Sequence, residues 1–102
     1  MSRREKLESL LADEPGDTFL RYALAMEWAN EDENEKSLAI YNDLMGETPP
    51  YVPAFFMAGQ QLAELDRNDE AREILTQGIA HAQTQGNLHA AGEMTEFRET
   101  LD

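Results

Sequence analysis

The stretch VPAFFMAGQQLAELDRNDEAREILTQGIAHA, residues 52–82, decides how this chain folds. Its apolar residues recur three and four positions apart on either side of a polar break at residues 66–69, which is the spacing of one face of an α-helix. The break has room only for a tight turn. The stretch therefore predicts two helices of about a dozen residues each, folded back as an antiparallel hairpin.

A second hairpin with the same pattern lies 34 residues upstream. When the sequence is shifted by this period, Ala25 aligns with Gly59. Tyr41 aligns with Leu75, so small residues match small ones and large apolar residues match large ones. The identical pairs are few: Ala29 and Ala63, Asp32 and Asp66, Asn34 and Asn68, Ile40 and Ile74. The repeat is therefore visible as a period and a pattern of side-chain sizes.

This pattern resembles the tetratricopeptide repeat (TPR), whose 34-residue motif reads W-x2-L-G-x2-Y, then A-x3-F, then a closing proline. The matching positions of the second copy hold Phe55, Ala58, Gly59, Leu62, Ala71, Leu75 and Gln83. Those of the first copy hold Arg21, Leu24, Ala25, Trp28, Ser37, Tyr41 and Pro49. Arg21, Ser37 and Gln83 depart from the motif. The resemblance implies an all-α fold of TPR-type antiparallel helix hairpins, a fragment of an α-solenoid.

The expected organisation is a single TPR domain over residues 1–102 with about six helices. A leading helix comes first, then two repeats, then a C-terminal capping helix, with the boundaries 1–16, 17–51, 52–86 and 87–102. Repeat arrays need end elements with one polar face. The last segment fits that role through one apolar stripe, formed by Leu88, Ala91, Met94, Phe97 and Leu101.

The turn inside the first repeat, residues 31–35, is rich in carboxylates. Asp32 and Glu35 have capping-box spacing, which predicts that Asp32 caps a helix over residues 36–46. A calcium site is the alternative interpretation of so many acidic groups. The turn lacks the spacing and the glycine of an EF-hand loop, so the capping interpretation is preferred.

The charge of the chain limits the classes of partner that it can bind. Acidic residues outnumber basic ones by 21 to 8, for a formal net charge of −13. Such a surface repels nucleic-acid phosphates and anionic lipid; it favours a basic partner or serves solubility. There is no cysteine, no apolar run of signal-peptide length, and no stretch near the about 20 apolar residues of a membrane helix. We expect a cytoplasmic protein that binds neither nucleic acid nor membrane.

The sequence offers few groups for chemistry. His89 and Glu93 lie four residues apart and could supply two zinc ligands, but an exposed polar pair is the simpler interpretation. The glycines are dispersed and form no phosphate-binding loop, and no serine, histidine and acid cluster indicates a nucleophile. We therefore expect no cofactor, no metal and no enzymatic activity.

The first helix of each repeat carries a second apolar stripe beyond the one that its hairpin needs. The TPR resemblance implies that such helices line a concave groove. At the groove positions this chain has Phe19, Tyr22, Met26, Asn30, Phe56, Gln60, Ala63 and Glu64. Family members that clamp a C-terminal carboxylate use lysine, arginine and asparagine in the groove. The residues Tyr22, Met26, Phe56 and Gln60 do not imply such a clamp.

An apolar and aromatic groove with an acidic rim predicts a non-catalytic protein-interaction module. Its partner would be a protein or peptide with apolar anchors and some lysine or arginine. The alternative is a self-associating scaffold subunit, in which a second copy covers the same face to form a homodimer. The sequence leaves both interpretations open.

Overall fold

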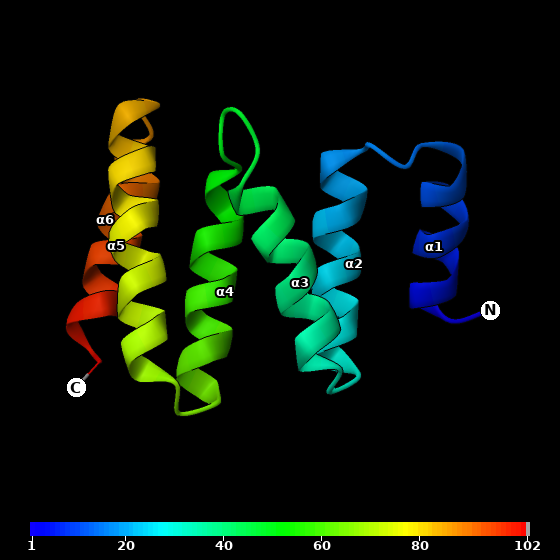
Figure 1. Cartoon of the computed structure of the whole chain (residues 1–102), viewed down its shortest axis with the longest axis horizontal. Helices are drawn as coiled ribbons and strands as arrows, with labels where there is room; N and C mark the ends of the chain where they lie inside the picture. The colour runs from blue at the N-terminus through cyan, green and yellow to red at the C-terminus, as the bar shows by residue number, and fades with distance from the viewer. Residues whose placement is uncertain (102) are drawn as a thin grey trace. The chain divides into compact units, whose positions relative to one another are not determined.

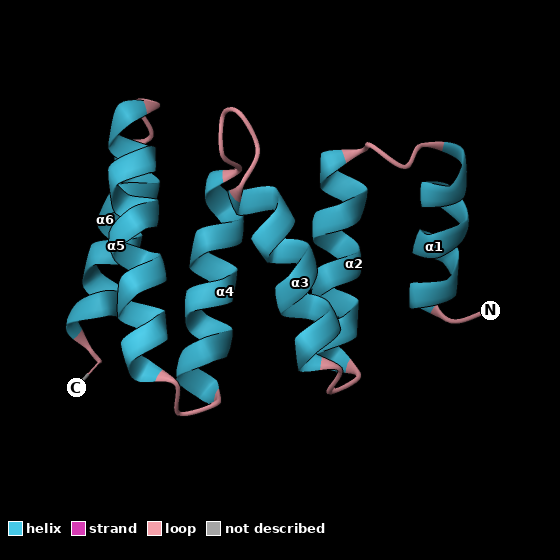
Figure 2. Ribbon diagram, viewed as in Figure 1, coloured by secondary structure: helices cyan, strands magenta, loops and turns pink. Residues whose placement is uncertain are grey.

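The structure, a computed structural model, describes residues 1–101. These residues form six helices and no strand (Figures 1 and 2). The helices are α1 (Arg3–Asp13), α2 (Thr18–Asn30), α3 (Asn34–Met45), α4 (Val52–Glu64), α5 (Asn68–Thr84) and α6 (Leu88–Glu99). The predicted all-α fold of consecutive helix hairpins with a C-terminal helix is confirmed.

The chain divides into two compact units, and each is described by itself. The first covers Met1–Leu44 and the second begins at Met45. The prediction that residues 1–102 act as a single domain stays a prediction, and residue 102, at the end of the predicted capping segment, lies outside the described residues.

The first unit closes around a contact between α2 and α3. Asp17 is the N-cap of α2, and its Oδ1 accepts a hydrogen bond from the Leu20 amide at 2.9 Å. Further along, Ala25 and Ser37 are both fully buried. The Ser37 hydroxyl donates to the Ala25 carbonyl at 2.6 Å. The serine that departs from the TPR alanine therefore packs as a small residue with its polar group satisfied.

The second unit has its core between α4, α5 and α6, which lie side by side (Figure 1). The buried cluster consists of Val52, Phe55, Leu75, Ile79, Ala82, Ala91 and Met94. Two glycines allow the helices to approach closely. A Cβ atom at Gly59 would lie 2.7 Å from Cδ2 of Leu75, and one at Gly78 would lie 2.5 Å from Cβ of Phe55.

Three helices, α2, α4 and α5, end in the same backbone motif. The residue after each C-cap has a positive φ: 61° at Asp32, 60° at Asp66 and 75° at Gly86. At the end of α2, the Asp32 amide donates to the Ala29 carbonyl and the next amide donates to the Trp28 carbonyl, at 3.0 and 2.9 Å. Equivalent bond pairs follow α4 and α5. This is the Schellman arrangement, which satisfies carbonyls that the helix leaves without partners.

The prediction that Asp32 caps α3 is therefore wrong. Asp32 lies in the left-handed conformation that ends α2, and α3 begins at Asn34, two residues before the predicted start. Aspartate is favourable at a helix N-cap and also tolerates the left-handed conformation. The spacing between Asp32 and Glu35 could not distinguish these two roles.

The apolar stripe of α6 is also shorter than predicted. Leu88 is 71% exposed, whereas Ala91 and Met94 are buried and Phe97 and Leu101 are partly buried against the core. The helix meets the core only from Ala90 onward, so its first two residues, which follow the N-cap Asn87, lie beyond the buried cluster.

Candidate functional site

The predicted groove residues of the first unit all lie on α2, where their spacing places them along one side of the helix. Phe19, in the first turn, is 66% exposed. Tyr22 is half-buried, with its ring centroid 6.0 Å from that of Tyr41 in α3. Met26 is half-buried and Asn30 is exposed. The structure therefore leaves Phe19 and part of Met26 for contact from outside, while part of Tyr22 serves the packing of α2 on α3.

Tyr41 shows why Tyr22 is held in place. Its side chain is fully buried, and within residues 1–101 its hydroxyl has no hydrogen-bond partner. Burial, followed by the nearby Tyr22, raises the pKa of the Tyr41 hydroxyl above its ordinary value. The Tyr22–Tyr41 pair is thus a packing contact, and the groove role of Tyr22 stays a prediction.

The predicted groove residues of the second unit all lie on α4. Phe56 is half-buried and packs edge-on against Phe97 of α6, with ring centroids 6.0 Å apart. Gln60 and Ala63 are half-buried, and Glu64 at the end of α4 is exposed. Helix α6 therefore stands beside the α4 residues, and part of the Phe56 ring is already used in that contact.

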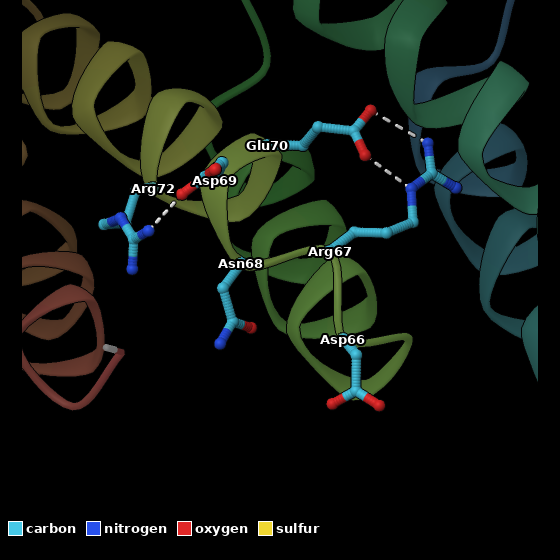
Figure 3. Close-up of a pocket in the computed structure, with 6 residues that line it drawn as sticks. All are labelled: Asp66, Arg67, Asn68, Asp69, Glu70 and Arg72. Atoms are coloured by element: carbon cyan, nitrogen blue, oxygen red, sulfur yellow. Dashed lines mark hydrogen bonds and ion pairs between the residues drawn. The ribbon is translucent and has the colours of Figure 1, made fainter.

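A hollow of about 320 Å³ lies at the turn between α4 and α5 (Figure 3). Every residue that lines it is polar or charged: Asp66, Arg67, Asn68, Asp69, Glu70 and Arg72. Arg67 donates to both carboxylate oxygens of Glu70, at 2.5 and 2.9 Å, and Arg72 pairs with Asp69. The hydrogen bonds from Arg67 lower the pKa of the Glu70 carboxyl. Binding pockets are mostly apolar, so this self-paired hollow is better explained as a charged turn.

The described residues offer no cluster for metal binding. No group of three or more histidine, cysteine, aspartate or glutamate side chains in residues 1–101 is arranged to hold a metal ion. The predicted His89–Glu93 pair is present on the outside of α6, with 3.4 Å between Nε2 and Oε1. None of the helices in this range is both long enough and apolar enough to cross a membrane.

One set of contacts was not anticipated from the sequence. Arg4 in α1 donates from Nε to both carboxylate oxygens of Glu31, at 3.1 and 3.0 Å, and Arg3 pairs with Glu27 at 3.2 Å. The Arg4 guanidinium also lies 4.6 Å from the ring centroid of Trp28. The tetratricopeptide resemblance places Trp28 at a motif position of the first repeat. The signal in the sequence was the adjacent arginine pair, but nothing local indicated which helix the pair would meet.

Known proteins show the same fold. A tetratricopeptide repeat domain protein from Salinibacter ruber, solved in solution, matches with a TM-score of 0.79 and 32% identity over 84% of this chain and 87% of that chain. A crystal structure of a tetratricopeptide repeat domain protein from the same organism matches with a TM-score of 0.71 and 33% identity, covering 80% and 92%. A protein from Bordetella parapertussis gives a TM-score of 0.82 at 24% identity over 98% of this chain and 87% of that chain, which shows the fold alone.

A relative found by its sequence also carries tetratricopeptide repeats. A TPR repeat-containing protein of Pseudomonas aeruginosa is 28% identical over 98 residues, which are 96% of this chain and 93% of the relative. No protein-family model matches the sequence. The hairpins and their neighbours define a helical-repeat protein of the class that serves in protein–protein interaction. More specifically, the chain belongs to the tetratricopeptide repeat family.

Proposed function

We propose that this protein is a non-catalytic interaction module of the cytoplasm that binds a protein or peptide. The exposed Phe19 carries the proposal: an aromatic side chain, 66% exposed, on the same side of α2 as Met26. Met26 is half-buried and adaptable in shape. Aromatic side chains at binding surfaces contribute much of the affinity for a partner's apolar anchors.

In the second unit, the α4 residues Phe56, Gln60, Ala63 and Glu64 are proposed to contact a protein or peptide partner as well. The exposed Glu64 and the net charge of −13 support a partner that carries lysine or arginine beside its apolar anchors. Such a rim acts mainly on the rate of association, and salt weakens its effect.

The test compares two changes that add the same kind of charge at different places. Phe19→Glu/Met26→Glu alters the α2 strip, and Leu88→Glu alters an exposed apolar residue of α6 as the control. Tyr22 is left unchanged because its loss would disturb the packing on Tyr41. Proteins captured from the native cell by the wild type should be lost with the α2 variant and kept with Leu88→Glu, while thermal unfolding shows that all three chains are folded.

Glu64→Lys tests the acidic rim separately. It should weaken capture at low salt more than at high salt, because the interaction is screened over a Debye length of about 10 Å at 0.1 M. If the α2 variant keeps every captured protein, the proposed surface is refuted. Light scattering covers the alternative function: a wild type that is dimeric, with an α2 variant that is monomeric, would assign the same strip to self-association.

A further inference from the structure

Helix α1 is attached to α2 in an unusual manner for an end helix. None of its residues is buried, and Leu10 is 52% exposed. By contrast, α6 places a fully buried Met94 and a buried Ala91 in the core of its unit. A permanent cap gains its stability from apolar burial. The apolar contribution of α1 is limited to the partly buried Leu7 and Leu11, and its ion pairs to α2 involve exposed or partly exposed arginines, which contribute little each.

The surface beneath α1 is built to hold arginine. Glu27 and Trp28 of α2 and Glu31, which follows the last residue of α2, form it, and we call these three residues the arginine face. Both carboxylate oxygens of Glu31 accept from the Arg4 Nε, Glu27 pairs with Arg3, and the Trp28 ring centroid lies 4.6 Å from the Arg4 Cζ atom. Lys36 of α3 also places its Nζ atom 4.4 Å from the Trp28 ring centroid. Two carboxylates beside an indole ring combine ion pairing with a cation–π contact, and this combination holds the arginine pair of α1.

We propose that the arginine face is a binding site for an arginine-bearing helix of a partner protein, and that α1 occupies it until the partner displaces it. Charge complementarity supports this occupant, because the chain is strongly acidic and its own arginine pair already sits on the face. The site differs from the proposed groove. Glu27 and Glu31 each follow a groove residue by one position and thus lie about 100° further around α2.

The probe for this site is a labelled peptide of residues 2–13, SRREKLESLLAD, added to the full chain. Arg3→Gln/Arg4→Gln in the chain should release α1 and tighten binding of the probe about tenfold over the wild type, because each lost polar contact contributes a factor of a few. Adding Glu31→Gln to that variant should remove the binding. A probe with glutamine at both arginine positions should not bind.

Trp28 is the one tryptophan of the chain, and both Arg4 and Lys36 lie against its ring, so its emission responds to loss of the Arg4 contact while the Lys36 contact stays. Release of α1 should shift its fluorescence emission, and the probe should reverse the shift. Lys6→Gln is the matched control: it removes a charge from the exposed side of α1 and should change neither the emission nor the probe affinity. Phe19→Glu/Met26→Glu should leave probe binding intact, so that failure of the groove and failure of this site are distinguishable.

The proposal is overturned if the probe fails to bind the arginine variant, if the glutamine probe binds equally well, or if Trp28 emission shows α1 still in place without its arginines. Should the double variant lose more helix than α1 contains, the wild-type chain with excess probe decides the question. The wild-type chain must then bind the probe at high probe concentration, and the Glu31→Gln variant of the wild-type chain must not.

Discussion

Gly78 lies where α4, α5 and α6 meet, and its replacement by alanine is a sharp test of the second unit. A Cβ atom there would stand 2.5 Å from the Phe55 Cβ and 2.8 Å from the Met94 Sδ. Carbon atoms in contact normally stay about 3.5–4.0 Å apart. Met94 has a flexible side chain, but the Phe55 Cβ cannot move without the backbone of α4. We therefore expect overpacking that costs about 1–3 kcal/mol.

Gly92 provides the matched control, because it also lies inside a helix but has nothing within 4 Å of its added Cβ. Both substitutions gain about 1 kcal/mol of helix propensity. That gain cancels in the comparison, so Gly78→Ala should be less stable than Gly92→Ala by the overpacking cost alone, about 1–3 kcal/mol. For a chain of this size the midpoints of thermal unfolding should differ by at least about 4 °C.

Far-ultraviolet circular dichroism during heating, with urea unfolding as a second measurement, gives both midpoints. The unfolding midpoint of Gly92→Ala is expected to be higher than that of the wild type. The midpoint of Gly78→Ala is expected to be lower than that of Gly92→Ala. If Gly78→Ala proves as stable as Gly92→Ala, the three helices do not meet at this residue as described, and the assignment of α6 to the core of the second unit fails.

The remaining predictions concern the helix ends and two buried side chains. Asp66→Gly should leave the free energy of unfolding unchanged or raise it, because glycine adopts the left-handed conformation without strain. For the same reason Gly86→Ala should lower the free energy of unfolding by about 1–2 kcal/mol. Equal urea midpoints for the two variants would contradict this. Tyr41→Phe should keep or raise stability at neutral pH, since it removes a buried hydroxyl that lacks a partner in residues 1–101. Because the pKa of Tyr41 is raised in the folded chain, the unfolded chain loses this proton at a lower pH than the folded chain does. The free energy of unfolding should therefore fall above about pH 10 in the wild type and fall less in Tyr41→Phe. Parallel pH profiles for the two chains would refute this. Met94→Ala should cost about 2–5 kcal/mol in urea unfolding, and a loss under about 1 kcal/mol would show that α6 does not close the core.

The fold could be predicted because side-chain size repeats with the period of the structure. The 34-residue shift aligned Ala25 with Gly59, and both are buried where helices touch. Ser37 took the place of alanine without loss, because its hydroxyl finds the Ala25 carbonyl across the hairpin. Helical periodicity and the need for close approach are local constraints, which the sequence carries directly.

The features that could not be predicted from the sequence depend on contacts between distant segments or on ambiguous local chemistry. Asp32 suits a helix start and a left-handed helix end equally, so its role depended on the chain that precedes it. Leu88 follows the apolar period of α6, but periodicity does not say where along a helix the core begins. Trp28 lies beneath Arg4, a contact that bridges 24 positions and leaves no spacing pattern. The groove residues stay a prediction, because each is placed on its helix without a partner to show its use.

The meeting of three helices at Gly78 also has a consequence for how the second unit opens. If α6 only covered a hairpin of α4 and α5 that was stable by itself, α6 could detach and return while the hairpin stayed folded. The amide hydrogens of α6 would then exchange with solvent faster than those of α4 and α5. Here Phe55, Gly78 and Met94 share one contact, so α6 cannot leave without emptying the place where α4 and α5 touch. The amides of all three helices should therefore exchange through one cooperative opening, which makes the second unit a single foldon.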